Sequence, residues 1–253
     1  MMVKQIVNSP HILLTGASGR IGRALVAPLA ERYPLRLLDR EPLEGHEDMI
    51  VADLNDEDAL ARAMEGIETV IHLAATPNDA PFMEKLLPDN IIGVYRVFEA
   101  AQAAGVRRMV FASTCQTVFG YDHGLTVSAL DPIRPRSLYA VTKGFGEILG
   151  RRYYEVYGME FLGVRIGAFT GYGDARLRTV DEVRRLWLSP RDAVTFFVRA
   201  IETRDIGYAV VFATSKTDPE YLGRASAREV LGFEPQDDVV EMFGELNAET
   251  NEF

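Results

Sequence analysis

The stretch TGASGRIG, residues Thr15 to Gly22, follows the apolar run Ile12 to Leu14 and precedes an amphipathic pattern. The apolar run predicts a buried strand, and the pattern after it predicts a helix. The glycines Gly16, Gly19 and Gly22 allow a tight turn, in which backbone N–H groups and a helix N-terminus can approach a phosphate. Strand, glycine-rich turn and helix in this order are typical of the first unit of a dinucleotide-binding fold.

Apolar runs alternate with amphipathic helical patterns along the rest of the chain. Several runs are apolar throughout, which is typical of strands buried on both faces of a parallel sheet. The alternation predicts an α/β fold of the Rossmann type, with a doubly wound parallel sheet. The expected strands are His11–Thr15, Leu35–Asp39, Met49–Asp53, Thr69–Ala74, Arg108–Ser113, Phe161–Ile166 and Ala209–Thr214, and the expected helices are Arg20–Tyr33, Glu57–Met64, Asn90–Ala104 and Leu138–Tyr157.

The pattern becomes irregular after Phe169. Residues Gly171–Val183 are rich in glycine, arginine and aspartate, and they predict a loop over a ligand. The tail beyond Glu241 is polar, and we expect it to be loosely ordered. We therefore expect a dinucleotide-binding domain over residues 1–166. A small substrate-binding portion, residues 167–253, would pack on it to form one compact unit.

Composition restricts the partners of the chain. The 253 residues carry a net charge of −10, which argues against nucleic acid because phosphate binding needs a basic surface. The N-terminus does not resemble a signal peptide, and no apolar run approaches the length that spans a bilayer. Cys115 is the only cysteine, so no internal disulfide can form. For these reasons we expect a cytoplasmic protein. We also expect no bound metal, because the four histidines show no metal-ligand spacing: His11, His46, His72 and His123.

An acidic residue lies where a dinucleotide-binding fold reads the adenosine ribose. Asp39 ends the second expected strand, 17 residues after Gly22. Its carboxylate can accept hydrogen bonds from the ribose hydroxyls and repels a 2′-phosphate, which favours NAD over NADP. The adjacent Arg40 could tolerate that phosphate. Asp53, together with Leu54, follows the third strand and could reach the adenine, although Asp53 could equally cap the next helix.

The second decisive motif is YAVTK, which begins at Tyr139 and ends at Lys143. Residues four apart share a helix face, so the two side chains can converge. An ammonium beside a phenol stabilises the phenolate, and we expect Lys143 to lower the pKa of Tyr139 and make it a general base. Thr114 ends the fifth expected strand, where its hydroxyl could position the same substrate oxygen. An ordinary amphipathic helix is the alternative interpretation of the spacing.

The order of these motifs resembles the extended branch of the short-chain dehydrogenase/reductase superfamily. The resemblance covers roughly Ile12 to Gly173 and includes HLAA at His72–Ala75, Asn90 and FAST at Phe111–Thr114. It implies Thr114, Tyr139 and Lys143 as the catalytic residues and NAD as the cofactor. Asn90 could instead cap the helix that follows it. The implied cofactor contacts are Gly16, Ser18, Gly19, Arg20, Ile21, Gly22, Asp39, Asp53, Leu54, Leu73, Ala74, Ala75, Asn90, Lys143 and Ile166.

Within that branch the chain looks most like the uronate dehydrogenase group. This similarity rests on the compact length, on VRIGAF from Val164 and on LWLSPRDAV from Leu186. Members of the group oxidise the anomeric hydroxyl of a hexuronic acid to a lactone with NAD. An arginine before Trp187 is expected to bind the substrate anion, but the motif does not identify which one. The implied substrate contacts are Thr76, Ser113, Cys115, Gln116, Ala168, Arg176, Arg178 and Arg184.

The motifs leave other functions open. A nucleotide-sugar epimerase or dehydratase would retain NAD and release no NADH. A non-catalytic dinucleotide sensor is a further alternative, although such proteins often lose the tyrosine or the lysine. The resemblance also implies a homodimer or higher homo-oligomer, in which two helices pair across a two-fold axis. The side chains expected at that contact are Val94, Val97, Phe98, Phe145, Ile148 and Leu149.

Overall fold

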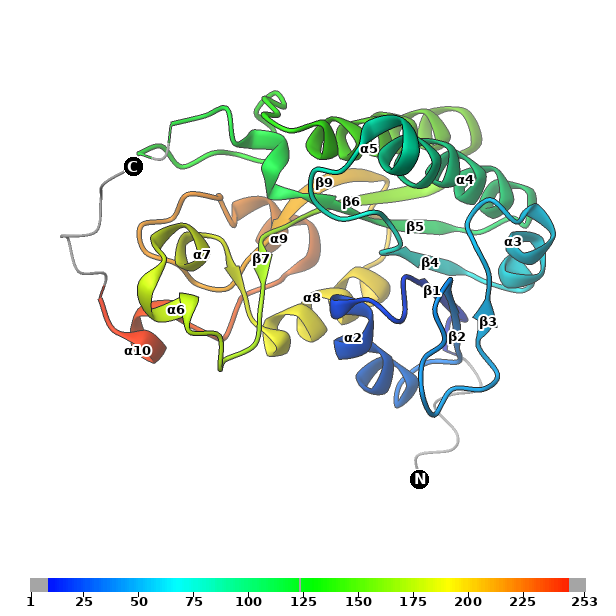
Figure 1. Cartoon of the computed structure of the whole chain (residues 1–253), viewed down its shortest axis with the longest axis horizontal. Coiled ribbons are helices and arrows are strands. Elements are labelled where there is room, and N and C mark those ends of the chain that lie inside the picture. The colour runs from blue at the N-terminus through cyan, green and yellow to red at the C-terminus, as the bar shows by residue number, and fades with distance from the viewer. Residues whose placement is uncertain (1–8, 123, 246–253) are drawn as a thin grey trace.

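The computed structural model describes residues 9–122 and 124–245 of the chain. Seven parallel strands form one sheet in the order β3-β2-β1-β4-β5-β6-β9 (Figure 1). This order confirms the expected Rossmann-type fold. The described residues do not include the N-terminal segment, which does not resemble a signal peptide in sequence, His123 or the end of the polar tail. The strands are β1 Ile12–Thr15, β2 Leu35–Asp39, β3 Ile50–Val51, β4 Thr69–His72, β5 Arg108–Thr114, β6 Glu160–Ile166 and β9 Tyr208–Ala213.

The strand order reverses beside β1, and this reversal places the ligand-binding edge of the sheet. β1 pairs with β2 on one side and with β4 on the other, so that Thr15 lies opposite both Leu38 and His72. Loops that follow neighbouring strands diverge at such a point and leave a crevice outside the carboxyl ends. The TGASGRIG turn follows β1 directly and therefore lies in that crevice.

Helices cover both faces of the sheet (Figure 1). Side chains of a strand alternate between the faces, and so Leu14 packs with Leu25 and Phe196 whereas Leu13 packs with Phe98. Both faces are apolar, which explains the continuously apolar runs of the sequence. One layer contains α2 (Arg20–Ala30) and α8 (Pro190–Glu202), and the other contains α3 (Glu57–Met64), α4 (Val94–Ala103) and α5 (Leu138–Tyr157).

Helix α5 lies close to the sheet. A Cβ atom at Gly146 would lie 2.2 Å from the ring of Phe111 on β5. Only a glycine allows this approach, which brings the face of α5 that carries Tyr139 and Lys143 against the end of β5. The helix has the bounds expected from the sequence, with Ser137 as its N-cap and Gly158 as its C-cap.

Two expectations about local structure are wrong. The helix expected to begin at Asn90 starts earlier, as the π-helical segment η1 (Phe82–Gly93), which continues into α4. Asn90 is therefore an interior residue and not a cap. The loop expected over Gly171–Val183 contains α6 (Arg176–Thr179) and the start of α7 (Asp181–Arg185). Buried side chains such as Leu177 and Trp187 hold these short helices in place, an effect of tertiary packing that composition does not reveal.

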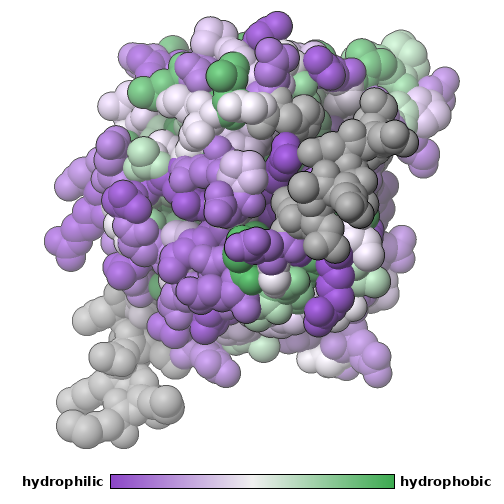
Figure 2. Space-filling model, turned by 90° about the vertical axis from the view of Figure 1, so that its left-hand side faces the viewer, coloured by the Kyte–Doolittle hydropathy of each residue, from purple (hydrophilic) through white to green (hydrophobic). Residues whose placement is uncertain are grey.

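Residues 167–245 form most of one end of the described part of the molecule (Figure 1). This end presents mainly hydrophilic side chains (Figure 2). Strand β9 nevertheless joins the main sheet beside β6. No helix in the described ranges has both the length and the apolar character needed to cross a bilayer. The remaining elements there are β7 (Ala168–Phe169), β8 (Trp187–Leu188), α9 (Ala225–Leu231) and α10 (Val239–Phe243).

Candidate active site

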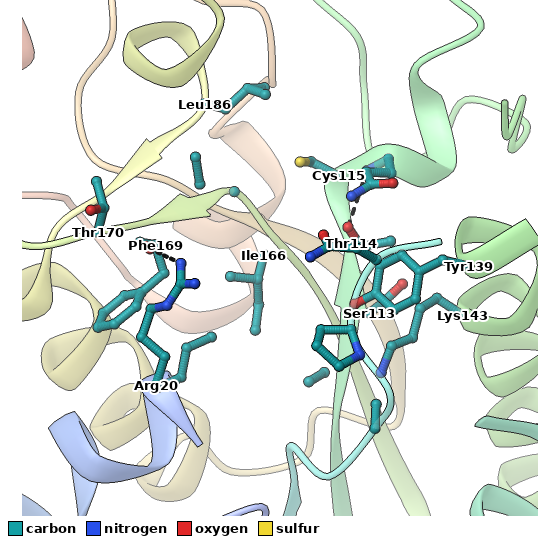
Figure 3. Close-up of a pocket in the computed structure, with 18 of the residues that line it drawn as sticks. Arg20, Ser113, Thr114, Cys115, Tyr139, Lys143, Ile166, Phe169, Thr170 and Leu186 are labelled. Carbon is teal, nitrogen blue, oxygen red and sulfur yellow. Dashed lines mark hydrogen bonds between the residues drawn. The ribbon is translucent and has the colours of Figure 1, made fainter. Parts of the chain in front are cut away.

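Two adjoining cavities lie at the carboxyl ends of the strands. The larger cavity, of about 590 Å³, is lined by Thr114, Tyr139 and Lys143 (Figure 3). The smaller cavity, of about 540 Å³, is lined by Asp39 and Asp53. Both include the glycine-rich turn in their lining, so they form two parts of one groove. The structure thus brings the two sequence motifs to one place.

The glycine-rich turn fits a bound phosphate. Gly16 has a φ of 75°, and a Cβ atom there would lie 2.6 Å from the backbone nitrogen of Ala74. The N-cap of α2 is Gly19, which has no side chain to accept the first N–H groups of the helix. A helix N-terminus that opens on a groove without a capping side chain suits the pyrophosphate of a dinucleotide. The residues present therefore fit NAD.

The smaller cavity holds a fixed carboxylate. The Oδ2 atom of Asp39 accepts a hydrogen bond of 2.9 Å from the backbone N–H of Ser18. Its Oδ1 atom accepts one of 3.1 Å from the backbone N–H of Glu41. Asp53 does not cap the next helix, because the N-cap of α3 is Asp56. The cavity is also lined by Ser18, Leu54, Leu73, Ala74 and Ala75 from the expected cofactor set.

The expected catalytic residues lie on one side of the larger cavity (Figure 3). Tyr139 and Lys143 are one turn apart on α5, and the Lys143 Nζ atom is 5.7 Å from the centroid of the Tyr139 ring. Thr114 ends β5 and is 6 % exposed. The start of α5 is fixed by Asp79, whose Oδ1 atom accepts a 2.9 Å hydrogen bond from the backbone N–H of Tyr139. These contacts make a phenol, an ammonium and a hydroxyl available to one ligand.

Burial determines the proton affinities in this cluster. It raises the pKa of the Tyr139 phenol, and the nearby Cys115 acts in the same direction. It also lowers the pKa of Lys143 to about 7. Burial and the nearby Lys143 lower the pKa of His72 to about 3, so this histidine is neutral at pH 7. The expectation that Lys143 lowers the Tyr139 pKa is therefore wrong for the protein alone, because desolvation of the phenol dominates.

A buried ion pair below the cavity was not expected from the sequence. Glu147 accepts two hydrogen bonds of 2.9 Å from Arg165 and a third, of 2.5 Å, from the Ser113 hydroxyl. Ser113 lines the larger cavity, as expected, but its hydroxyl already has this partner. Glu147 lies four residues after Lys143, on the same face of α5, and this spacing is the signal by which it could have been found.

Asn90 and Thr76 lie beside the groove, and neither lines the two cavities. The amide nitrogen of Asn90 donates to the Thr76 carbonyl (3.0 Å) and to the Thr142 hydroxyl (3.2 Å). The Thr142 hydroxyl donates to the carbonyl of Tyr139. The structure therefore places Asn90 as a link between the segment after β4 and α5. Thr76 donates its own hydroxyl to Asp89 at 2.5 Å.

The arginines before Trp187 divide into two groups. Arg176 lines the larger cavity and forms a 2.6 Å ion pair with Asp174. Arg184 is buried and donates to the carbonyls of Leu177 and Gly244, outside the cavity lining. Arg178 lies over the ring of Phe243, also outside that lining. The expectation that Arg178 and Arg184 contact substrate is not supported, because the packing of α6, α7 and α10 engages both side chains.

The rest of the larger cavity combines expected and unexpected residues. Gln116 lines the larger cavity, and its Oε1 atom accepts a 3.1 Å hydrogen bond from the Ser137 hydroxyl. No group of three or more metal-ligating side chains occurs in the described part of the chain. The sequence did not single out several other lining residues, because no motif assigned them a contact: Asn78, Phe119, Phe169, Thr170, Glu182 and Leu186. Those it expected are Arg20, Ile21, Cys115, Gln116, Ile166 and Ala168.

Comparisons with known proteins agree with this geometry. Residues 12–209 match the model of the NAD dependent epimerase/dehydratase family. The chain is 35 % identical over 250 residues to an NAD-dependent glucose-6-phosphate dehydrogenase from Haloferax volcanii, covering 91 % of this chain and 94 % of that protein. It is 36 % identical over 247 residues to an L-arabinose 1-dehydrogenase (NAD(P)(+)) from the same organism, covering 90 % of this chain and 96 % of that protein.

A solved structure is similar over nearly the whole chain. A uronate dehydrogenase from Agrobacterium tumefaciens, in a mutant complexed with NAD, superimposes with a TM-score of 0.82 and 31 % identity, covering 95 % of this chain and 92 % of that one. The family match spans more than half of the chain, and it agrees with the groove, the glycine-rich turn and the Tyr139–Lys143 pair. The chain belongs to the NAD dependent epimerase/dehydratase family, the extended branch of the short-chain dehydrogenases/reductases.

Proposed function

We propose that the protein is an NAD-dependent dehydrogenase that oxidises the anomeric hydroxyl of a sugar or sugar acid to a lactone. The observation that carries this proposal is the placement of Thr114, Tyr139 and Lys143 on a cavity that adjoins the dinucleotide groove. The similar proteins named above act on glucose 6-phosphate, arabinose and uronates. These substrates share an aldose ring with a free anomeric hydroxyl, so the proposal names that class.

The proposed reaction removes one proton and one hydride from the substrate. Tyr139 accepts the proton of the anomeric hydroxyl as its O–H bond breaks, and Thr114 holds the same oxygen by a hydrogen bond. NAD, when bound, accepts the hydride that leaves the anomeric carbon. Lys143 binds the nicotinamide ribose and stabilises negative charge on Tyr139. The electron pair of the broken O–H bond forms the carbonyl of the lactone.

The cofactor contacts form a second part of the proposal. The turn at Gly16 to Gly22 binds the pyrophosphate, and Asp39 accepts hydrogen bonds from the adenosine ribose. Asp53 and Leu54 contact the adenine, and Ile166 lies beside the nicotinamide. Asn90 donates to the Thr142 hydroxyl, which in turn donates to the carbonyl of Tyr139 in the first turn of α5. Asn90 therefore acts through Thr142 and needs no direct contact with NAD.

The substrate side of the cavity supports an aldose with an anionic end. Of the three arginines expected to contact substrate, Arg176 lines the larger cavity, and a guanidinium there can bind a carboxylate or a phosphate. Gln116 lines the cavity wall next to Thr114 and can donate to a sugar hydroxyl. Residues 167–253 supply Ala168 and Arg176, and we propose this segment as the substrate-binding portion.

Oligomeric state and location complete the proposal. Of the six side chains expected at the dimer contact, Val94, Val97 and Phe98 are fully buried against the sheet and cannot serve. Other apolar side chains of η1, α4 and α5 are exposed, and a homodimer would cover them. Free Cys115 suits a reducing compartment, and we propose the cytoplasm. The exposed apolar side chains are Ile92, Tyr95, Leu138, Val141, Ile148, Val156 and Tyr157.

The test is a search for NADH production. The purified protein is incubated with NAD, and separately with NADP, across glucuronate, galacturonate, neutral aldoses and aldose phosphates. We expect NADH absorbance to rise in proportion to one sugar of the panel. An epimerase or dehydratase would convert a nucleotide sugar with no net NADH, and a non-catalytic sensor would bind NAD with no turnover. Either of these results would overturn the proposed dehydrogenase.

A further inference from the structure

Arg40 lies where an arginine could admit NADP. It follows Asp39 directly and lines the smaller cavity. An arginine near the acidic residue at the end of β2 is the usual means by which this fold accepts a 2′-phosphate. The sequence alone therefore leaves the choice between NAD and NADP open at this position.

The structure shows that Arg40 already has an anionic partner. Its Nη2 atom is 2.9 Å from Oδ2 of Asp89, and the side chains are 48 % and 13 % exposed respectively. Arg40 also interacts electrostatically with Asp53 and Asp39. A 2′-phosphate would have to compete with these carboxylates for one guanidinium.

Asp89 is fixed independently of Arg40. Its Oδ2 atom accepts the Thr76 hydroxyl at 2.5 Å. The next residue, Asn90, is fully buried and forms two hydrogen bonds with the backbone of Thr76. The carboxylate is thus held at the cavity by the η1 segment and by the loop after β4.

The net charge of the smaller cavity also disfavours a 2′-phosphate. Its lining has a formal charge of −2, which disfavours the entry of a further dianion. Two basic residues, Arg23 and Arg40, face four acidic ones, Asp39, Glu41, Asp53 and Asp89.

We propose that Asp89 is a cofactor-specificity residue, which enforces NAD over NADP by holding the Arg40 guanidinium in an ion pair at the cavity edge. The proposal rests on the dinucleotide site and not on which sugar is oxidised. Removing the Asp89 charge would release Arg40 toward a 2′-phosphate and would also reduce the repulsion of that phosphate.

The experiment measures dissociation constants of NADH and NADPH by nicotinamide fluorescence, without any sugar. For Asp89→Asn we expect NADPH to bind about tenfold more tightly, with NADH changed by less than about twofold. For Arg40→Ala alone we expect only a small loss of NADPH affinity, because Asp89 already withholds the guanidinium and the variant changes only the net charge of the lining. In the double variant most of the NADPH gain should disappear.

Thr76→Val is the matched control. It removes the anchor of Asp89 but keeps the ion pair with Arg40, so we expect no tenfold gain for NADPH. An equal change for both cofactors in Asp89→Asn would overturn the proposal, as would a gain that persists without Arg40. A marked loss of NADPH binding in Arg40→Ala alone would also overturn it. If neither cofactor bound the wild-type protein, the cofactor assignment itself would fail, and the proposal with it.

Discussion

Glu147 on α5 and Arg165 on β6 form a two-point ion pair beneath the larger cavity, with both donor–acceptor distances at 2.9 Å. The two side chains are 6 % and 4 % exposed. Glu147 also accepts the hydroxyl of Ser113, the residue before Thr114 on β5. The pair therefore ties helix α5, which carries Tyr139 and Lys143, to two strands of the sheet, one turn of α5 beyond Lys143.

Loss of the Glu147 charge is expected to destabilise the fold. Glu147→Gln leaves Arg165 charged and without an anionic partner in the interior, which costs about 3–5 kcal/mol in comparable pairs. Urea unfolding would measure the change. The control is Glu155→Gln, on the same helix, because Glu155 pairs with Arg151 at the surface and should contribute less than about 1 kcal/mol. Similar small losses in both variants would contradict this account.

The close approach of α5 to the sheet predicts a second effect. In Gly146→Ala the new methyl group would lie 2.2 Å from the Phe111 ring, so the helix or the ring must shift. We expect a loss of about 1–3 kcal/mol from overpacking. Thermal unfolding measures it, with Gly173→Ala as control, because a Cβ atom at Gly173 meets nothing within 4 Å. A melting temperature unchanged in Gly146→Ala would show that α5 does not pack as described.

Lys143 is expected to make stability depend on pH. Burial lowers its pKa from 10.5 to about 7, so between these values the unfolded chain binds more protons than the folded protein. The contribution of this group to the free energy of unfolding therefore rises with pH across that window. Lys143→Met lacks the effect, and its stability relative to wild type should fall between pH 7 and pH 9. Urea unfolding without cofactor tests this.

The contributions of other titrating groups to the free energy of unfolding should cancel when Lys143→Met is compared with wild type. His72 interacts electrostatically with Lys143, but its pKa of about 3 is far below the range from pH 7 to pH 9. A stability difference between Lys143→Met and wild type that is constant from pH 7 to pH 9 would mean that the ammonium is not desolvated.

Tyr139→Phe separates catalysis from cofactor binding. The phenol is the proposed proton acceptor, and loss of a general base typically costs 10²- to 10⁴-fold, so kcat should fall by about that factor. NADH affinity, measured by fluorescence, should stay within about twofold. Because burial raises the Tyr139 pKa, wild-type kcat/KM should increase toward alkaline pH. Near wild-type turnover in Tyr139→Phe would rule out the assigned mechanism.

Much of the fold could be predicted because its signals are local. The apolar runs of a buried parallel sheet and the glycine-rich turn between β1 and α2 both appear in short windows of sequence. The spacing of Tyr139 and Lys143 predicted their shared helix face for the same reason. The proposed NAD site follows from residues whose positions these elements fix, such as Asp39 at the end of β2.

The remaining features depend on contacts between distant segments. Arg184 could not be separated from Arg176 by sequence, because only the packing of α6 and α7 buries one and leaves the other at the cavity. The pair of Arg40 with Asp89 joins residues 49 positions apart. Burial of Tyr139 reverses the expected direction of its pKa shift, and burial depends on the whole fold.

Hydride transfer from the anomeric carbon to NAD can be tested by labelling one hydrogen atom of the sugar. The protein is incubated with NAD and an aldose of the reactive class carrying deuterium at the anomeric carbon, and the cofactor is analysed by mass spectrometry. We predict reduced cofactor that contains the deuterium, with one lactone formed for each. Deuterium that stays in the sugar, with no reduced cofactor released, would contradict oxidation at the anomeric carbon.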